Sequence, residues 1–413
     1  MTRSATVIGG GPAGLMAAEV LAAAGTRVTV YEHMPSAGRK LLLAGRSGLN
    51  ITHNEPVDKL VARFGEARAM LEPAVRAFDP HAVRSWCEGL GESTFVGSTG
   101  RVFPSSFRAT PLLRAWLRRL EQMGVTIELR QRWLGWCTDD ENRLDPRRSR
   151  FSGPSGATIE AVSDVTVLAL GGASWPRVGS DGGWVDTVRR AGVHVNDLRP
   201  ANCGIHIEWT THFAERFAGA PLKNVALSIG DTSARGDAII TSRGMESGPV
   251  YAVSSMARDA LDRDGRCVMK VDLRPDLAVD VLAQRLARRR PKDSLASSLR
   301  RTIDLSPVAA SLLREAAGNK VPTQPDELAS MVKAMPLVVD SIAPLVRAIS
   351  SAGGVALAEI DESFMLRRLP STFVAGEMLD WEAPTGGYLL QASLSTAVAA
   401  ARGALAWMDG NVN

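Results

Sequence analysis

The chain has 413 residues, of which 45% are hydrophobic and 22% are charged, and its formal net charge is +4 at pH 7. This balance is typical of a folded protein with a sizeable core and argues against extensive disorder. The four cysteines form no CxxC pair, and together with the six histidines they form no ligand cluster. We therefore expect no metal, no disulfide chemistry and a reducing, cytoplasmic setting.

The amino-terminal segment VIGGGPAGLMAAEVLAAA is apolar, but its three consecutive glycines and its proline would break a signal-peptide helix. Elsewhere the sequence has no apolar run of about 18 residues, the length expected of a membrane span. The sequence therefore predicts no membrane partner.

A glycine-rich turn joins the first predicted strand, which ends near Ile8, to a predicted helix that runs to about Ala24. In the pattern Gly-x-Gly-x-x-Gly, the first glycine permits a tight turn, the second lets the backbone approach a pyrophosphate, and the third lets helix and strand pack closely. A second strand, 27–31, ends in an acid that could bind an adenosine ribose. The glycine motif alone fits any helix packed on a sheet. Here strand, glycine turn, helix, second strand and terminal acid follow one another at the expected spacing, which predicts a dinucleotide site at Gly9, Gly11, Pro12, Ala13, Gly14 and Glu32.

Arg39 and Lys40 follow the acidic strand end. A cationic pair at this place could contact phosphate or ribose, whereas the same pair on a solvated helix face would have no ligand. Its position after the second strand favours the ligand contact.

The middle of the chain changes character twice. The segment 124–136 alternates like a strand pair, and 164–172 is an apolar strand that ends in paired glycines. From about 193 to 353, short strand-like pieces precede a stretch, 276–345, with a mostly helical pattern. GPVYAVSS within this region could line a pocket, but the start of a packed helix is the preferred interpretation.

The most basic run of the chain is RLARRRPKDSLASSLRR, at 285–301. Such a run can track phosphates. Few aromatic residues interleave with it, however, so it provides no stacking platform for single-stranded nucleic acid. A solvated helix face is the favoured interpretation, and a nucleic-acid partner is disfavoured.

Near the carboxyl end, TFVAGEMLDWEAPTGGYLLQAS begins as a buried strand, passes through two acids and a Gly-Gly pair, and continues as an alanine-rich helix. The start of such a helix would stabilise negative charge on a bound ligand. An ordinary carboxyl-terminal turn with solvated acids is the alternative.

Five ordered blocks, covering about half of the chain, resemble the HI0933-like, or BaiN-like, FAD-dependent oxidoreductases: GGGPAGLMAAEVLAAAGTRVTVYE, GRKLLLAGRSGLNIT, GRVFPSSFRAT, LALGGASWPRVGSDGGW and GEMLDWEAPTGGYLLQAS. The resemblance implies an α/β fold with a discontinuous, glutathione-reductase-like, Rossmann FAD-binding domain at 1–192 and 354–413. A mixed β-barrel and helical domain would be inserted at 193–353, where it would cover the flavin and shape a substrate pocket.

The resemblance also implies cofactor contacts beyond the amino-terminal motif. The backbone of Trp133 would meet the adenine, Gly171 would pass close to the cofactor, and Gly376 and Asp380 would lie at the pyrophosphate and ribityl chain. Where the family often has Arg-Cys-Asn, this chain has Gly48-Leu49-Asn50, which removes a thiol role but keeps Asn50. The remaining contacts would come from the start of the last helix, at Gly387, Tyr388 and Gln391.

We therefore predict an oxidoreductase with non-covalent FAD that accepts hydride from NADH or NADPH and reduces a C=C or C=O of a small organic substrate. The sequence identifies no catalytic residue and no oligomeric state. Two alternatives stay open: an RNA-binding, tRNA-modifying flavoprotein, and a flavin-binding sensor without turnover.

Overall fold

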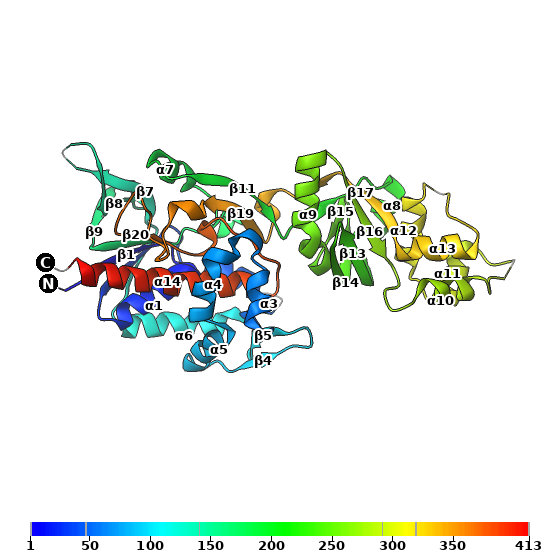
Figure 1. Cartoon of the computed structure of the whole chain (residues 1–413), viewed down its shortest axis with the longest axis horizontal. Coiled ribbons are helices and arrows are strands. Elements are labelled where there is room, and N and C mark those ends of the chain that lie inside the picture. The colour runs from blue at the N-terminus through cyan, green and yellow to red at the C-terminus, as the bar shows by residue number, and fades with distance from the viewer. Residues whose placement is uncertain (1, 46–47, 140, 291, 319, 412–413) are drawn as a thin grey trace. The chain divides into compact units, whose positions relative to one another are not determined.

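The computed structural model describes residues 2–45, 48–139, 141–290, 292–318 and 320–411. They divide into two compact units (Figure 1). Unit 1 covers Met1–Arg199 and Ser350–Asn413, and unit 2 covers the intervening Pro200–Ile349. The amino-terminal and carboxyl-terminal parts of the chain thus share one unit, and the second unit is inserted between them.

A five-stranded parallel sheet forms the centre of unit 1, in the order β20 (Thr372–Val374), β10 (Val165–Leu168), β1 (Ser4–Ile8), β2 (Arg27–Glu32) and β6 (Thr126–Leu129). All four neighbouring pairs run parallel. Strands β20, β10 and β1 are adjacent in this sheet. They correspond to the three apolar strands predicted from the sequence: the start of the TFVAGEM segment, the strand within 164–172 and the strand that ends near Ile8. Strands buried on both faces in this way read as continuous apolar runs, not as alternating ones.

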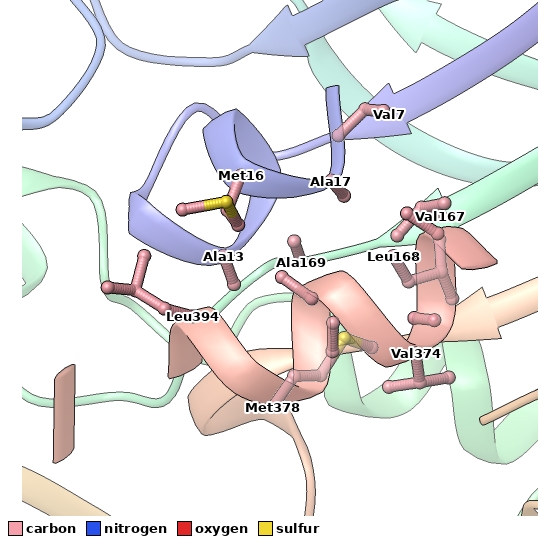
Figure 2. Packing of buried hydrophobic residues seen from close by; sticks show 14 of the residues in the cluster. Val7, Ala13, Met16, Ala17, Val167, Leu168, Ala169, Val374, Met378 and Leu394 are labelled. Carbon is pink, nitrogen blue, oxygen red and sulfur yellow. The ribbon is translucent and has the colours of Figure 1, made fainter. Parts of the chain in front are cut away.

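Helices α1 (Pro12–Ala23) and α14 (Tyr388–Gly410) pack against each other beside this sheet. Figure 2 shows Ala13, Met16 and Ala17 of α1 near Leu394 of α14, with Val7, Val167 and Val374 contributed by three strands. The small side chains let the helices approach closely. The core of unit 1 therefore joins elements from both ends of the chain.

Three smaller sheets complete unit 1. They consist of β3 (Thr52–His53), β5 (Arg101–Pro104) and β4 (Thr94–Val96); of β7 (Arg132–Thr138), β8 (Leu144–Ser152) and β9 (Thr158–Val162); and of β11 (Val195–Ala201) with β19 (Ser350–Val355). The other helices of unit 1 are α2 (Arg39–Ala44), α3 (Val57–Ala62), α4 (Arg68–Ala77), α5 (Pro80–Gly89), α6 (Ala109–Gln122) and α7 (Val185–Arg190).

The segment 124–136 forms two strands, but they belong to different sheets. β6 joins the parallel sheet, whereas β7 pairs with β8. Between them, Arg130 has a φ of 59° and its N–H donates to the Met34 carbonyl, while the Gln131 N–H donates to the Glu32 carbonyl. These hydrogen bonds to the end of β2 turn the chain between the two strands. The alternating apolar pattern of 124–136 was therefore produced by two strands that do not pair with each other.

Unit 2 contains a seven-stranded antiparallel sheet in the order β17 (Met335–Val339), β16 (Cys267–Asp272), β13 (Pro221–Ile229), β14 (Thr232–Thr241), β15 (Gly244–Glu246), β12 (Ile205–His206) and β18 (Ser341–Ile342). Its helices are α8 (Thr211–Phe217), α9 (Gly248–Asp264), α10 (Val279–Leu286), α11 (Leu295–Ile303), α12 (Pro307–Ala316) and α13 (Pro325–Lys333). They share an apolar core with the sheet.

Two expectations for this region can be compared with the structure. GPVYAVSS begins the packed helix α9, as the sequence analysis preferred. The mostly helical pattern expected for 276–345, in contrast, ends at Lys333, and the chain continues as β17 and β18. In β17 buried and exposed residues alternate, which is the period of a strand whose two faces differ in burial.

Candidate functional site

The candidate site lies where parallel strands of unit 1 end. The chain leaves β1 through the glycine turn, β10 through 169–172, β20 through 375–377, and β2 at Glu32. The backbone binds these exits together: the Gly9 N–H donates to the Tyr31 carbonyl at 2.8 Å, and the Ala375 N–H donates to the Leu168 carbonyl at 2.9 Å. In open α/β sheets, ligands bind in a crevice at this edge.

The three glycines of the turn have different local requirements. Gly9 has a φ of 110°, and a Cβ there would lie 2.3 Å from the Ala169 carbonyl oxygen. A Cβ on Gly14 would lie 1.8 Å from the Gly9 carbonyl oxygen, so this glycine permits the close packing of α1. A Cβ on Gly11, in contrast, would meet no atom within 4 Å. Among the described residues nothing requires a glycine at Gly11, and the open space in front of it is what a close-approaching ligand needs.

Two helix N-termini are free to bind an anion. Pro12 and Ala13 begin α1, which has Gly11 as its N-cap residue, and Tyr388 begins α14, whose N-cap residue is Gly387 with a φ of 103°. Neither helix has a side-chain cap or an acid in its first turn. A Cβ on Gly376 would lie 2.7 Å from the Ala13 Cβ, so the late glycine segment lies directly on the start of α1. Free N–H groups and helix dipoles of this kind stabilise phosphate and other negative charge.

Glu32 is buried at the end of β2, with 8% of its surface exposed. Its carboxylate accepts hydrogen bonds from the backbone N–H groups of Gly10, at 2.8 Å, and Met34, at 2.7 Å. Burial alone would raise the pKa of Glu32, but hydrogen bonds from His33, Met34 and Gly10 together outweigh burial and hold this pKa below its ordinary value. Glu32 is therefore an anionic acceptor at the position predicted for the ribose contact.

Two predicted residues carry buried polar atoms without a partner among the described residues: Nε of Arg39 and Oδ1 of Asn50. Buried polar groups are normally hydrogen-bonded, so an unpaired one calls for an explanation. Lys40 is placed differently, because its Nζ already lies 2.6 Å from a Glu377 carboxylate oxygen and 2.8 Å from the Ser174 hydroxyl. The ligand contact predicted for Lys40 would thus have to coexist with this ion pair.

Trp133 lies on β7 with 8% of its surface exposed, and its ring meets that of Trp136 edge-on at a centroid distance of 4.9 Å. The indole Nε1 atoms of both residues are buried without a partner among the described residues. Gly171 follows β10 with a φ of 69°, and its carbonyl accepts a hydrogen bond from Trp184. The adenine contact of Trp133 and the cofactor contact of Gly171 stay predictions.

Asp380 is half-buried, and its Oδ2 accepts a hydrogen bond from Asn196 Nδ2 at 2.6 Å. The ring of Tyr388 stacks on His53 at 5.2 Å. Burial, followed by a hydrogen bond with Glu55, raises the pKa of Tyr388 far above its ordinary value, so its hydroxyl stays protonated. The ribityl contact of Asp380 and the flavin contact of Tyr388 stay predictions.

The side chain of Gln391 is fully buried in unit 1. Its Nε2 donates to the Phe78 carbonyl, at 2.7 Å, and to the Ser395 hydroxyl, at 2.9 Å, while Oε1 accepts from the Thr52 hydroxyl at 2.5 Å. This amide therefore fastens α14 to two other segments. Its predicted cofactor contact stays a prediction.

Sequence reasoning missed Glu377 and its partners. One Glu377 carboxylate oxygen accepts from Lys40, and the other accepts from the Ser351 N–H at 3.0 Å. Gly172 leaves room for this arrangement, because a Cβ there would lie 2.3 Å from the Ser351 hydroxyl oxygen. The only signal in the sequence was an acid directly after the late glycine, and it gave no indication of its partners.

The residues at this edge fit FAD. The open space at Gly11 and the free N-termini of α1 and α14 suit a pyrophosphate and a flavin ring, Glu32 suits a ribose, and Arg39 and Asn50 offer unpaired polar atoms. Fold and site together define a Rossmann-type, FAD-binding flavoprotein of the oxidoreductase class.

The chain belongs to the family of the HI0933-like protein Rossmann domain, whose model matches residues 3–403. It is 24% identical to the 3-dehydro-bile acid delta(4,6)-reductase of Clostridium scindens, over 96% of this chain and 98% of that protein. The family resemblance and the fold class predicted from the sequence are thereby confirmed.

Solved structures share the fold at low sequence identity. The 3-ketosteroid delta1-dehydrogenase of Sterolibacterium denitrificans superimposes with a TM-score of 0.56 and 14% identity, over 98% of this chain and all of that one (100%). A flavocytochrome c3 fumarate reductase gives a TM-score of 0.54 and 15% identity, over 98% of this chain and 78% of that one. Among the described residues, no helix is long and apolar enough to cross a membrane.

Proposed function

We propose that this protein is an FAD-dependent oxidoreductase that accepts hydride from NADH or NADPH and reduces a C=C or C=O of a small organic substrate. The observation that carries the proposal is the contact between Gly376 and Ala13, which brings the late glycine segment onto the start of α1. The start of α1 can hold a pyrophosphate, and the late glycine segment that lies against it leads into α14, whose own uncapped start suits a flavin.

We assign the following roles to the residues of unit 1. The backbone from Gly9 to Gly14 would bind the pyrophosphate, and Glu32 would accept hydrogen bonds from the ribose. Asp380 and Asn50 would bind polar groups nearer the flavin, and the N-terminus of α14 would stabilise negative charge there. When bound, FAD supplies the hydride chemistry, while the protein supplies orientation and electrostatics.

The direction of the reaction is supported by the relative from Clostridium scindens, whose name describes a reductase of 3-dehydro-bile acids. Its sequence matches this chain over nearly the full length of both proteins. We infer from this that the substrate is a small, largely apolar molecule with an unsaturated or carbonyl group. We further propose that the inserted region, predicted at 193–353, covers the flavin and shapes the substrate pocket.

The first test is an absorbance spectrum of the purified protein, followed by anaerobic addition of NADH and then NADPH. We expect a flavin spectrum that bleaches with at least one of the two donors. If the protein shows no flavin spectrum even after incubation with FAD, it does not bind FAD, and the whole proposal is contradicted. A flavin that neither donor reduces would contradict the NAD(P)H step and favour another electron donor or a sensor.

Heating or acid treatment should release the flavin, because we propose non-covalent binding. The supernatant is then analysed by chromatography against FAD and FMN standards. Flavin that stays with the precipitated protein would contradict the non-covalent assignment and leave the reductase proposal intact.

A further inference from the structure

The basic run 285–301 is not part of the site in unit 1, and it dominates the charge of the chain. It contains seven Lys and Arg residues and one Asp, although the whole protein has a formal net charge of only +4. The rest of the chain is therefore net acidic. A concentration of positive charge in one segment of an otherwise nearly neutral protein is a physical reason to look for an anionic ligand there.

The fold of unit 2 gathers part of this charge around a cavity of about 380 Å³ that is open to solvent. It is lined by Arg285, Arg288, Arg301 and Thr302, and all three arginines are exposed. Arg285 lies in the last turn of α10, and Arg288 follows three positions later, after the helix has ended at Leu286. Arg301 and Thr302 belong to α11, which is in contact with α10 (Figure 1). The cavity is thus built by two helices and does not depend on a single helix surface.

Two of the three guanidinium groups have no acidic partner. Arg301 forms an ion pair with Asp293. Within the described part of the chain, neither Arg285 nor Arg288 forms an ion pair with a carboxylate. Like charges that face one cavity repel each other, and an anion between them would remove this repulsion. Guanidinium groups, moreover, bind phosphate oxygens through paired N–H donors.

We propose that this cavity binds a phosphate group carried by a small molecule. Its volume lies near the lower end of the roughly 300–1,000 Å³ typical of small-molecule sites. Charged side chains line it, which suits a phosphate or pyrophosphate and not an apolar substrate. A single cavity without interleaved aromatic rings favours a small phosphate ligand over single-stranded nucleic acid, whose bases need stacking partners.

Helix ends offer a different explanation for the same arginines. Cations near a helix C-terminus offset the partial negative charge of the last carbonyls, and all three arginines lie at or just after such ends. This explanation predicts an effect on stability alone. The phosphate proposal predicts an effect on ligand binding, so the two can be separated.

The experiment is isothermal titration calorimetry of the full-length, FAD-loaded protein with inorganic phosphate and with pyrophosphate, at ionic strength held constant with NaCl. The test variant is the double substitution Arg285→Gln and Arg288→Gln. Its matched control is Arg289→Gln with Arg290→Gln, which removes the same charge from the same run but leaves the lining residues of the cavity unchanged.

We expect pyrophosphate to bind the wild-type protein, the test variant to bind at least about tenfold more weakly, and the control to stay within about twofold. Equal weakening in both variants would show a diffuse charge effect and overturn the proposal. A lower melting temperature of the test variant, with pyrophosphate binding unchanged, would assign the arginines to the helix ends and equally overturn it. Binding of single-stranded RNA without binding of pyrophosphate would replace the site with a nucleic-acid surface.

The flavin absorbance of both variants provides an independent control. The proposal does not depend on the reductase activity, and we expect the FAD content of both variants to equal that of the wild type. Retention of pyrophosphate binding by a preparation from which FAD has been removed would further support a second, separate site.

Discussion

At the scale of single residues, Gly11 and Gly14 belong to the same motif but have different physical roles. Gly14 is required by the protein, because a side chain there would collide with the backbone of Gly9. Gly11 has open space in front of it. A substitution at Gly11 therefore tests the ligand, whereas a substitution at Gly14 tests the packing of the fold.

We predict that Gly11→Ala weakens FAD binding by at least about tenfold, or ~1.4 kcal/mol, because the new methyl group occupies the space that the pyrophosphate needs. The melting temperature of the FAD-free protein should stay close to that of the wild type. Gly410→Ala is the matched control, since a Cβ there also meets no atom within 4 Å, but at the far end of α14. Flavin affinity is measured by fluorescence quenching. Unchanged affinity in Gly11→Ala would contradict the placement of the pyrophosphate.

Glu32 gives a prediction for pH. Its pKa in the folded protein lies below the ordinary value of 4.5. A lowered pKa contributes stability that is present above the unfolded-state pKa and is lost as the pH falls through the folded-state pKa. Glu32→Gln should therefore reduce the free energy of unfolding at pH 7 by about 1–3 kcal/mol, because an amide has one acceptor oxygen for two backbone donors.

The difference in stability between Glu32→Gln and wild type should shrink as the pH is lowered below about 4.5, where Glu32 of the unfolded wild-type chain begins to gain its proton while the folded protein still resists protonation. Urea denaturation at a series of pH values measures it. Glu66→Gln, at an exposed glutamate, serves as the control. A difference that stays constant down to pH 3 would mean that the charge of Glu32 contributes nothing to stability.

At the scale of elements, α14 connects the core to the site. One face packs on α1, its first turn faces Thr52, and Gln391 bonds to Phe78, Ser395 and Thr52. Such a helix is fixed in its direction by polar bonds as well as by packing. The N-terminus of α14 is therefore held in a fixed position, as its proposed contact with the flavin requires.

We predict that Gln391→Ala lowers the free energy of unfolding by about 2–4 kcal/mol, because it removes buried hydrogen bonds and leaves the Thr52 hydroxyl without its acceptor. The matched control is Gln122→Ala, at the exposed end of α6. Chemical denaturation of the FAD-free protein measures both. A loss no larger than that of the control would show that packing alone holds α14 in place.

At the scale of the whole molecule, unit 2 is one continuous segment whose ends meet. The Ile349 N–H donates to the Asn202 carbonyl at 3.1 Å, and β11 pairs with β19. Unit 2 also has its own apolar core. These are the properties of a domain inserted into another, although the chain switches units a few residues inside the predicted boundaries of 193–353.

We predict that residues 200–349 fold on their own and unfold cooperatively, as measured by circular dichroism during heating. Residues 1–199, joined to 350–413 by a short Gly-Ser linker, should bind FAD without unit 2. If residues 200–349 fold but the linked fragment of 1–199 and 350–413 does not bind FAD, the inserted region contributes to the cofactor site. Failure of the first to fold would contradict its independence.

The sequence by itself determined the local parts of this protein. The strand, glycine turn, helix and terminal acid at 4–32 follow from period and spacing within about 30 residues, and the late strand and helix follow in the same way. These rules act between neighbours in the chain. They predicted the dinucleotide-binding strand, turn and helix of the fold.

Only the tertiary structure decided which distant side chains meet. The sequence did not show that Lys40, a predicted ligand contact, is also paired with Glu377, or that the amide of Gln391 makes three hydrogen bonds within the protein. The basic run was expected to be a solvated face, and three of its arginines, Arg285, Arg288 and Arg301, are exposed, but only the packing of α11 on α10 places them around one open cavity. The physical reason is that an ion pair, a buried amide and a cavity depend on elements far apart in the chain, whose approach no local pattern encodes.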